Sequence, residues 1–244
     1  MQPELQPIRT SDAAYERGAP RYAPGDRIVD VVDSQKVLRN TYLLLAATMV
    51  PTIAGALAGM ATAGVIIAHP IISFFVMLAA TLGLQAGIVA NRNSALGIVF
   101  LLLMTGLLGW FIGPLLNYAL ALRNGAQLVG YAAGGTGLVF LTMGAIATTT
   151  KRDFSFLGKF LFVGMIALLL AMVANLFFQI PALALTISTL VIVVFSLFLL
   201  HDLSRIVTGG ETNYLMATTG VYLSLFNIFV NLLQILMALS GERD

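Results

Sequence analysis

The sequence predicts an all-α polytopic membrane protein, a compact bundle of seven transmembrane helices. Hydrophobic residues make up 59% of the 244 residues and charged residues only 10%, whereas a soluble domain carries roughly 25% charged residues. Long apolar runs follow one another after residue 36, each about the 20 residues that a helix needs to cross a bilayer. Backbone groups in a bilayer must bond within their own segment, so these runs are expected to be helices.

Seven such runs are separated by short polar turns, which leaves no room for a second folded domain. Proline lacks an amide proton, so we expect a kink or a helix start at Pro51, Pro70, Pro114 and Pro181. We predict spans at residues 41–62, 66–90, 95–117, 126–149, 155–177, 181–203 and 214–239.

Glycines within the runs predict close helix packing. Four pairs are spaced four residues apart, and small residues at that spacing let a neighbouring helix approach closely. The pairs are Gly55 and Gly59, Gly83 and Gly87, Gly109 and Gly113, and Gly130 and Gly134.

Basic residues are distributed unevenly between the two sides of the predicted bundle. Eleven lysines and arginines lie before the first run or in turns on the same side, and only Arg123 and Arg243 lie on the other. Positive charge marks the cytosolic side, which predicts a cytosolic N-terminus. Seven crossings then place the short C-terminus, residues 241–244, outside.

Residues 1–36 differ from the rest of the chain. They contain four prolines, several acidic residues and few large aliphatic side chains, a composition that buries too little apolar area to offset the cost of ordering. We predict a mobile cytosolic tail, with a short amphipathic helix around Arg27–Val37, before a transmembrane domain at residues 37–240. Two roles stay open for the tail: a spacer that sets topology, or a handle for a cytosolic partner.

Few residues in the chain are suited to catalysis. There is no cysteine, which excludes disulfides and thiolate chemistry. No phosphate-binding loop, dinucleotide fingerprint, zinc-protease motif or nucleophile elbow is present. His69 and His201 are isolated, whereas a zinc site needs three or four converging ligands. We therefore predict no catalytic residue, cofactor or metal site, and no nucleic-acid partner.

Asp202 is the one carboxylate expected within the sixth run or at its end. A carboxylate inside the membrane is costly and is typical of a functional site. Alternatively, Asp202 lies at the cytosolic rim and pairs with Arg205, three residues later on the same helix. His201 points about 100° away around the helix, so spacing alone does not join it to Asp202.

The seventh run carries a stripe of polar residues. Ser224, Asn227, Asn231 and Gln234 are spaced three, four and three, which places them on one helical face. In lipid this face must turn inward. It either lines a path together with Asp202 or forms hydrogen bonds that hold helices together.

Several segments resemble the Bax inhibitor-1 family. Gly109–Leu116 contains a Gly-Pro-Leu sequence similar to the family signature. Further similar segments are residues 37–42, 149–158, 199–206, 222–229 and 232–236. The resemblance covers about residues 30–240 in the family's order, and the bacterial YccA-like branch is the most similar.

The resemblance implies a seven-helix fold around one central helix, located in a bacterial inner membrane. It also implies our leading hypothesis for function. YccA-like proteins bind the membrane-anchored AAA protease FtsH, are gripped by their cytosolic N-terminal tail, and modulate the protease by occupying it. The expected partners are thus an FtsH-type protease and the lipid bilayer.

A second function is also implied, a pH-sensitive leak of calcium or another cation. In the family, two aspartates on the last two helices share protons and act as the sensor. Asp202 matches the first aspartate, but Ser224 stands at the position of the second. One carboxylate facing a hydroxyl lacks the mutual pKa shift of two carboxylates. A polar path past Asp202, Ser224, Asn227 and Asn231 stays open as the alternative.

Overall fold

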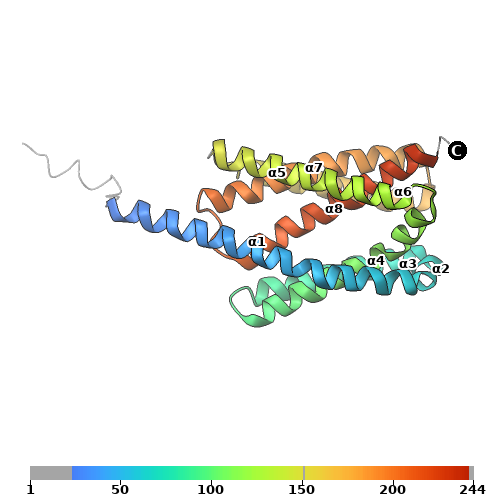
Figure 1. The fold of residues 1–244 in the computed structure, drawn as a ribbon, viewed down its shortest axis with the longest axis horizontal. Coiled ribbons are helices and arrows are strands. Elements are labelled where there is room, and N and C mark those ends of the chain that lie inside the picture. Colours follow the sequence, from blue (N-terminus) through green and yellow to red (C-terminus); the bar gives the residue numbers. More distant parts are fainter. Residues whose placement is uncertain (1–23, 151, 242–244) are drawn as a thin grey trace, which may run out of the picture.

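The computed structural model describes the backbone of residues 24–150 and 152–241, which form eight helices (Figure 1). Seven of these described helices are long and apolar enough to cross a membrane, and the remaining one, α2, is short. The predicted fold class is therefore confirmed. The helices are α1 (Pro24–Ala61), α2 (Ala63–Ala68), α3 (Pro70–Ala90), α4 (Ala95–Ala121), α5 (Gly125–Thr150), α6 (Leu157–Phe178), α7 (Pro181–Val207) and α8 (Tyr214–Gly241).

Helix α1 begins well before the first predicted span. It runs without a break from Pro24 to Ala61, so the helix expected around Arg27–Val37 is the first part of α1 and not a separate element. Its membrane-spanning part begins near Ser34. Residues 1–23 of the predicted tail lie outside the described residues.

Prolines mark two helix starts, as expected. Pro70 and Pro181 occupy the first turns of α3 and α7, where a missing amide proton costs nothing. Pro51 and Pro114 lie within α1 and α4. The predicted second span is interrupted, because non-helical backbone at His69 separates α2 from α3.

Helix α8 is the central helix of the bundle. It packs against α5 and α7 on one side and against α1, α3 and α4 on the other, and Figure 1 shows it running between these two groups. By contrast, α6 packs mainly on α7. The last helix in the chain therefore connects the two halves of the fold.

The most extensive helix contact joins α1 to α4, and glycines make it possible. A Cβ atom added to Gly55, Gly59, Gly109 or Gly113 would overlap backbone atoms of the opposite helix. The opposing backbone atoms belong to Gly106, Trp110, Thr52, and Gly59 with Met60, respectively. Two of the four predicted glycine pairs thus bring helix backbones together.

The other two pairs do not contact a helix backbone, so this part of the prediction was wrong. A Cβ on Gly83, Gly130 or Gly134 would meet open space, and one on Gly87 would meet only the ring of Phe100. Spacing alone does not reveal which helix face has a neighbour.

We expect Gly55→Ala to weaken the bundle and Gly134→Ala to leave it intact. Overpacking at a rigid contact costs about 1–3 kcal/mol, and the obstacle at Gly55 is backbone that cannot rotate away. At Gly134 the added methyl meets nothing, and alanine favours a helix over glycine by about 1 kcal/mol. Thermal unfolding of both variants in the same detergent measures the difference. Equal melting temperatures would contradict the proposed role of the α1–α4 contact.

Candidate functional site

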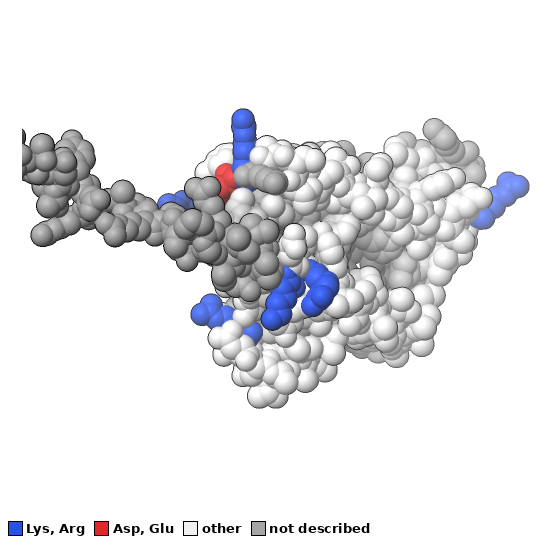
Figure 2. All heavy atoms as spheres, turned by 60° about the vertical axis from the view of Figure 1, so that its left-hand side comes forward, with Lys and Arg blue, Asp and Glu red and all other residues white. Residues whose placement is uncertain are grey.

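One end of the bundle carries most of the positive charge. This basic end is formed by the start of the membrane-spanning part of α1, the turns α3–α4, α5–α6 and α7–α8, and the adjoining helix ends. Figure 2 shows Lys and Arg gathered there, with basic atoms also at the far end. The basic residues whose side chains are described are Lys36, Arg39, Arg92, Arg152, Lys159 and Arg205 at the basic end, and Arg123 at the opposite end.

Two turns are tied together at the basic end by Asn213. Its Nδ2 donates to the carbonyl of Arg92 at 2.8 Å and to Oδ1 of Asn93 at 2.9 Å. Its Oδ1 accepts from the amides of Leu215 and Met216 at the start of α8, which satisfies donors that a helix start leaves free. The start of the central helix is thereby fixed to the α3–α4 turn.

Asp202 lies at the basic end in contact with His201. His201 Nδ1 and Asp202 Oδ1 are 3.0 Å apart, and the two side chains are 12% and 21% exposed. The prediction from helical spacing that these neighbours point apart was wrong. Adjacent Cβ atoms start close together, and both side chains turn into the same space between helices.

Glycines on two helices make room for this pair. A Cβ on Gly158 of α6 would lie 3.1 Å from Nε2 of His201, and a Cβ on Gly220 of α8 would collide with the carboxylate of Asp202. The pair is therefore enclosed by α6 and α8. It is not fully buried, since both side chains keep some exposed surface.

Arg205 bonds to the turn that follows α7. The alternative expectation, that Arg205 pairs with Asp202, was wrong. Its guanidinium lies 3.3 Å from Oε2 of Glu211 and donates to the carbonyl of Gly210 at 3.1 Å. The amide of Glu211 in turn donates to the carbonyl of Arg205. The chain folds back after Val207 and brings Glu211 next to Arg205. Helical spacing within α7 does not predict this contact.

A further carboxylate, Asp153, lies in the turn between α5 and α6. Ser155 donates to it from both its hydroxyl and its amide. These hydrogen bonds, aided by positive charge at His201 and Arg205, hold the pKa of Asp153 below its usual value. Asp153 thus keeps a negative charge beside the His201–Asp202 pair to lower pH than a free aspartate.

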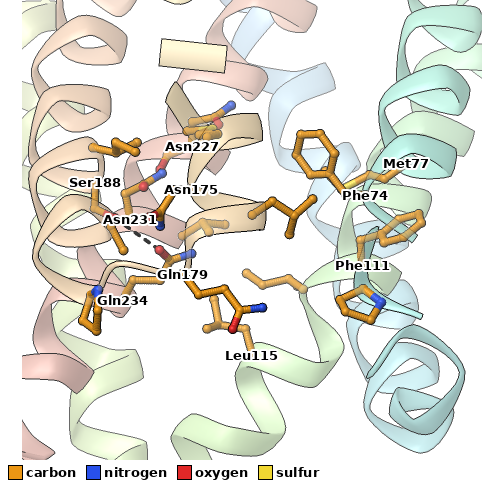
Figure 3. Close-up of a pocket in the computed structure, with 18 of the residues that line it drawn as sticks. Phe74, Met77, Phe111, Leu115, Asn175, Gln179, Ser188, Asn227, Asn231 and Gln234 are labelled. Atoms are coloured by element: carbon orange, nitrogen blue, oxygen red, sulfur yellow. Dashed lines mark hydrogen bonds between the residues drawn. The ribbon is translucent and has the colours of Figure 1, made fainter. Parts of the chain in front are cut away.

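The polar stripe of α8 faces a cavity of about 700 Å³ that lies toward the opposite end of the bundle. Asn227, Asn231 and Gln234 line it together with Ser188 of α7 (Figure 3). Ser188 donates to Oε1 of Gln234 at 3.2 Å. Asn227 and Asn231 each donate to a carbonyl one turn earlier in α8, both at 2.8 Å.

The predicted site residues therefore lie in two separate places. Helices α7 and α8 run antiparallel, since Asp202 meets Gly220 and Ser188 meets Gln234. These contacts are fourteen residues apart on each helix, or about 21 Å at a rise of 1.5 Å per residue. Asp202 and Arg205 belong to the basic end, whereas Asn227 and Asn231 belong to the cavity.

Buried apolar side chains occupy the helix positions between these two places. Leu199 of α7 and Val221 of α8 are fully buried, and both belong to the largest apolar cluster of the described bundle. Ser224, one turn beyond Gly220, is 2% exposed and lies in the same stretch. The predicted polar path is thus filled by packed side chains in this conformation.

Tyr222 is the largest fully buried side chain of this stretch. Its hydroxyl lies 2.9 Å from Oγ1 of Thr52 in α1 and 3.4 Å from the carbonyl of Thr105 in α4. Oγ1 of Thr52 also lies within donating distance of the carbonyl of Thr48. Tyr222 has a single hydroxyl proton, so it donates to either Thr52 or the carbonyl of Thr105 at one time. One phenol therefore links the central helix to both members of the α1–α4 pair.

Sequence reasoning missed part of the cavity. Asn175 and Gln179, at and just after the end of α6, line it as well, and their spacing of four residues in an otherwise apolar run was a usable signal. Gln179 takes a left-handed conformation, φ 51°, that ends α6. Among the described residues, no three His, Asp or Glu side chains converge as a metal site would require.

Similarity to known proteins covers nearly the whole described chain. A family model described as "Inhibitor of apoptosis-promoting Bax1" matches residues 34–241. A protein of Escherichia coli K12 named "Modulator of FtsH protease YccA" is 41% identical over 218 residues, which are 86% of this chain and 97% of that protein. An uncharacterised membrane protein of Vibrio cholerae is 40% identical over 218 residues, 89% of this chain and 96% of that protein. A counterpart in a second Escherichia coli strain, 41% identical over the same shares, is named "Inner membrane protein YccA".

We expect Tyr222→Phe to lower the stability of the bundle, because it removes the buried hydroxyl that lies against Thr52 of α1 and the carbonyl of Thr105 of α4. A buried hydrogen bond contributes about 0.5–1.5 kcal/mol. Tyr118→Phe is a matched control, since that side chain is 65% exposed. Thermal unfolding in detergent compares the two variants. A drop as large for Tyr118→Phe as for Tyr222→Phe would rule out the role given to the buried hydroxyl.

Proposed function

The chain belongs to the Bax inhibitor-1 family, and we propose that it is a non-enzymatic regulator that binds and inhibits an FtsH-type membrane AAA protease. One observation carries this proposal. The Escherichia coli relative named as a modulator of FtsH protease aligns over 97% of its own length, so the similarity extends across all seven spans. The relatives also support a multi-pass inner membrane protein.

The charge distribution supports an orientation that suits this role. Six of the seven lysines and arginines with described side chains lie at the basic end, which the positive-inside rule places in the cytosol. The N-terminus then lies in the cytosol and residues 241–244 lie in the periplasm. The protease carries out ATP-driven extraction from the cytosolic side, so the N-terminal tail is the segment it meets.

The proposed mechanism is occupation of the protease by a substrate that resists extraction. Residues 1–23 precede the first described helix and, drawn out at about 3.3 Å per residue, reach about 75 Å. The bundle behind them is held by backbone contacts between α1 and α4. Pulling on α1 therefore works against the most extensive packing in the fold, and the protease stays engaged.

Degradation of a membrane substrate by an FtsH-type protease in proteoliposomes tests the proposal. We expect slower degradation when this protein is added at near-stoichiometric amounts, because each copy occupies one protease. Removing residues 1–23 should restore the uninhibited rate while leaving every described residue in place. Unchanged degradation in the presence of the full chain would refute the proposal.

Two controls separate the parts of the mechanism. A variant with residues 1–23 in scrambled order keeps the length and composition of the tail, and it should inhibit if any graspable segment suffices. A fluorescent protein that matures only in the cytosol should stay dark when fused after Asp244. Fluorescence from that fusion would overturn the orientation, and inhibition without residues 1–23 would overturn the tail mechanism.

A cation leak is a second proposal, favoured by the cavity. Asn227 and Asn231, two of the predicted path residues, line a space of about 700 Å³. Their amide oxygens are ligands of the kind that hard cations accept. Conduction requires Leu199, Val221 and Tyr222 to move, so that the cavity joins the basic end near Asp202.

Flux of calcium into liposomes that contain the purified protein tests this second proposal. We expect Asp202→Asn to reduce any flux severalfold, because the path would lose the carboxylate at its cytosolic mouth. Asp153→Asn is a matched control, since Asp153 lies in the exposed turn beside that mouth. Absence of flux from the unaltered protein would eliminate the leak, and equal effects of both substitutions would eliminate the role of Asp202.

A further inference from the structure

The cavity on the polar face of α8 has two chemically different walls. One wall, from α6, α7 and α8, carries all the polar side chains of the lining among apolar ones, and the other wall, from α3 and α4, is apolar (Figure 3). The polar wall contains Asn175, Gln179, Ser188, Asn227, Asn231 and Gln234, and the apolar wall contains Phe74, Met77, Phe111 and Leu115.

The polar wall offers both hydrogen-bond acceptors and donors to an occupant. Asn227 and Asn231 use their Nδ2 groups on backbone carbonyls, which leaves their Oδ1 atoms as acceptors. Gln234 and Asn175 use their side-chain oxygens, the first for Ser188 and the second for the amide of Ile180. Their NH₂ groups therefore remain as donors. These four groups form no other bond within the described part of the chain.

The residues that line the cavity include no Asp, Glu, Lys, Arg or His. A lipid whose head group is ionised would lose part of its hydration there without gaining a counter-charge, which costs free energy. The lining therefore favours an uncharged lipid head over one that carries a phosphate, carboxylate or ammonium group. It complements an uncharged head that donates and accepts hydrogen bonds, such as a group of hydroxyls or amides.

The apolar wall and the position of the cavity point to a ligand from the bilayer. The cavity lies between α3, which packs on α4, and α6, which packs on α7. Exposed apolar side chains, including Ile71 and Phe75 of α3, continue from it toward the lipid. A volume of about 700 Å³ falls in the range of about 300–1,000 Å³ typical of small-molecule sites. A membrane-spanning helix, about 10 Å wide and 30 Å long, is several times too large.

We propose that this cavity binds an uncharged amphiphile from the half of the bilayer opposite the basic end. Its hydroxyl- or amide-bearing head bonds to the amides of α6 and α8, and its chain lies along Phe74 and Phe111. This assignment goes beyond the regulation of a protease and does not depend on it.

Photo-crosslinking tests the assignment on the full-length protein in nanodiscs of zwitterionic lipid. The probe is a monoacylglycerol with a diazirine in its acyl chain, and the comparison probe is the fatty acid of equal chain length, which is anionic. We expect the monoacylglycerol to label α3 and α4 near Phe74 and Phe111, and to be displaced by unlabelled monoacylglycerol. The fatty acid should label this region at least about threefold less, the effect of losing about one hydrogen bond.

Two substitutions locate the head. Gln234→Leu should reduce labelling by monoacylglycerol about three- to tenfold. The substitution removes the unbonded NH₂ group of Gln234 and leaves the hydroxyl of Ser188 without its acceptor. Asn124→Leu is a matched control at the same end of the bundle, since Asn124 bonds to Ser240 outside the cavity. Its labelling should equal that of the unaltered protein.

A third substitution keeps the test decisive if Gln234→Leu fails to fold. Ala184 lines the cavity from α7, so Ala184→Trp fills it while every amide side chain is kept, and it should abolish labelling while the protein stays monodisperse. Labelling that persists in the folded Gln234→Leu or Ala184→Trp variants would overturn the proposal. Equal labelling by the neutral and anionic probes, or labelling spread over the lipid-facing helices, would overturn it as well.

Discussion

The direct backbone contact between α1 and α4 is the constraint on which the rest of the structure depends. Lipid surrounds the bundle, so hydrophobic burial adds little to helix association and close packing must supply it. Four glycines allow α1 and α4 to touch over their length. This contact also sets the distance that Tyr222 must cover, since its hydroxyl reaches Thr52 on one helix and Thr105 on the other.

The antiparallel alignment of α7 and α8 determines how polarity is distributed along the bundle. It places the His201–Asp202 pair at the basic end and the amide groups about 21 Å away, with Leu199, Val221 and Tyr222 between them. The polar residues of the last two helices thus serve two different surroundings. One lies at the basic end, and the other lines the cavity between α3, α4 and α6.

The spans could be predicted from the sequence because each depends on local composition alone. Pro70 and Pro181 also indicated where α3 and α7 begin. The side-chain contacts could not be predicted in the same way. Arg205 pairs with Glu211 because the chain reverses after α7, and His201 reaches Asp202 because Gly158 and Gly220 leave room from other helices.

Local sequence likewise could not predict which glycine pairs contact another helix or which residues line the cavity. Gly55 and Gly134 sit in similar sequence patterns, yet only Gly55 faces another backbone. Of the predicted stripe of Ser224, Asn227, Asn231 and Gln234, the last three line the cavity and Ser224 does not. The partners of that face, Asn175 and Ser188, come from α6 and α7, and only the packing of three helices brings them together.

The central position of α8 has a consequence for biogenesis. The helix that contacts α1, α3, α4, α5 and α7 is the last of the described helices to be synthesised. Until then Tyr222 is absent, and the two groups of helices can meet only through the smaller contacts of α4 with α5 and of α1 with α7 in the described bundle. The packing surfaces that the other helices present to α8 therefore have to wait for it, and the bundle reaches its final packing only after α8 has been inserted.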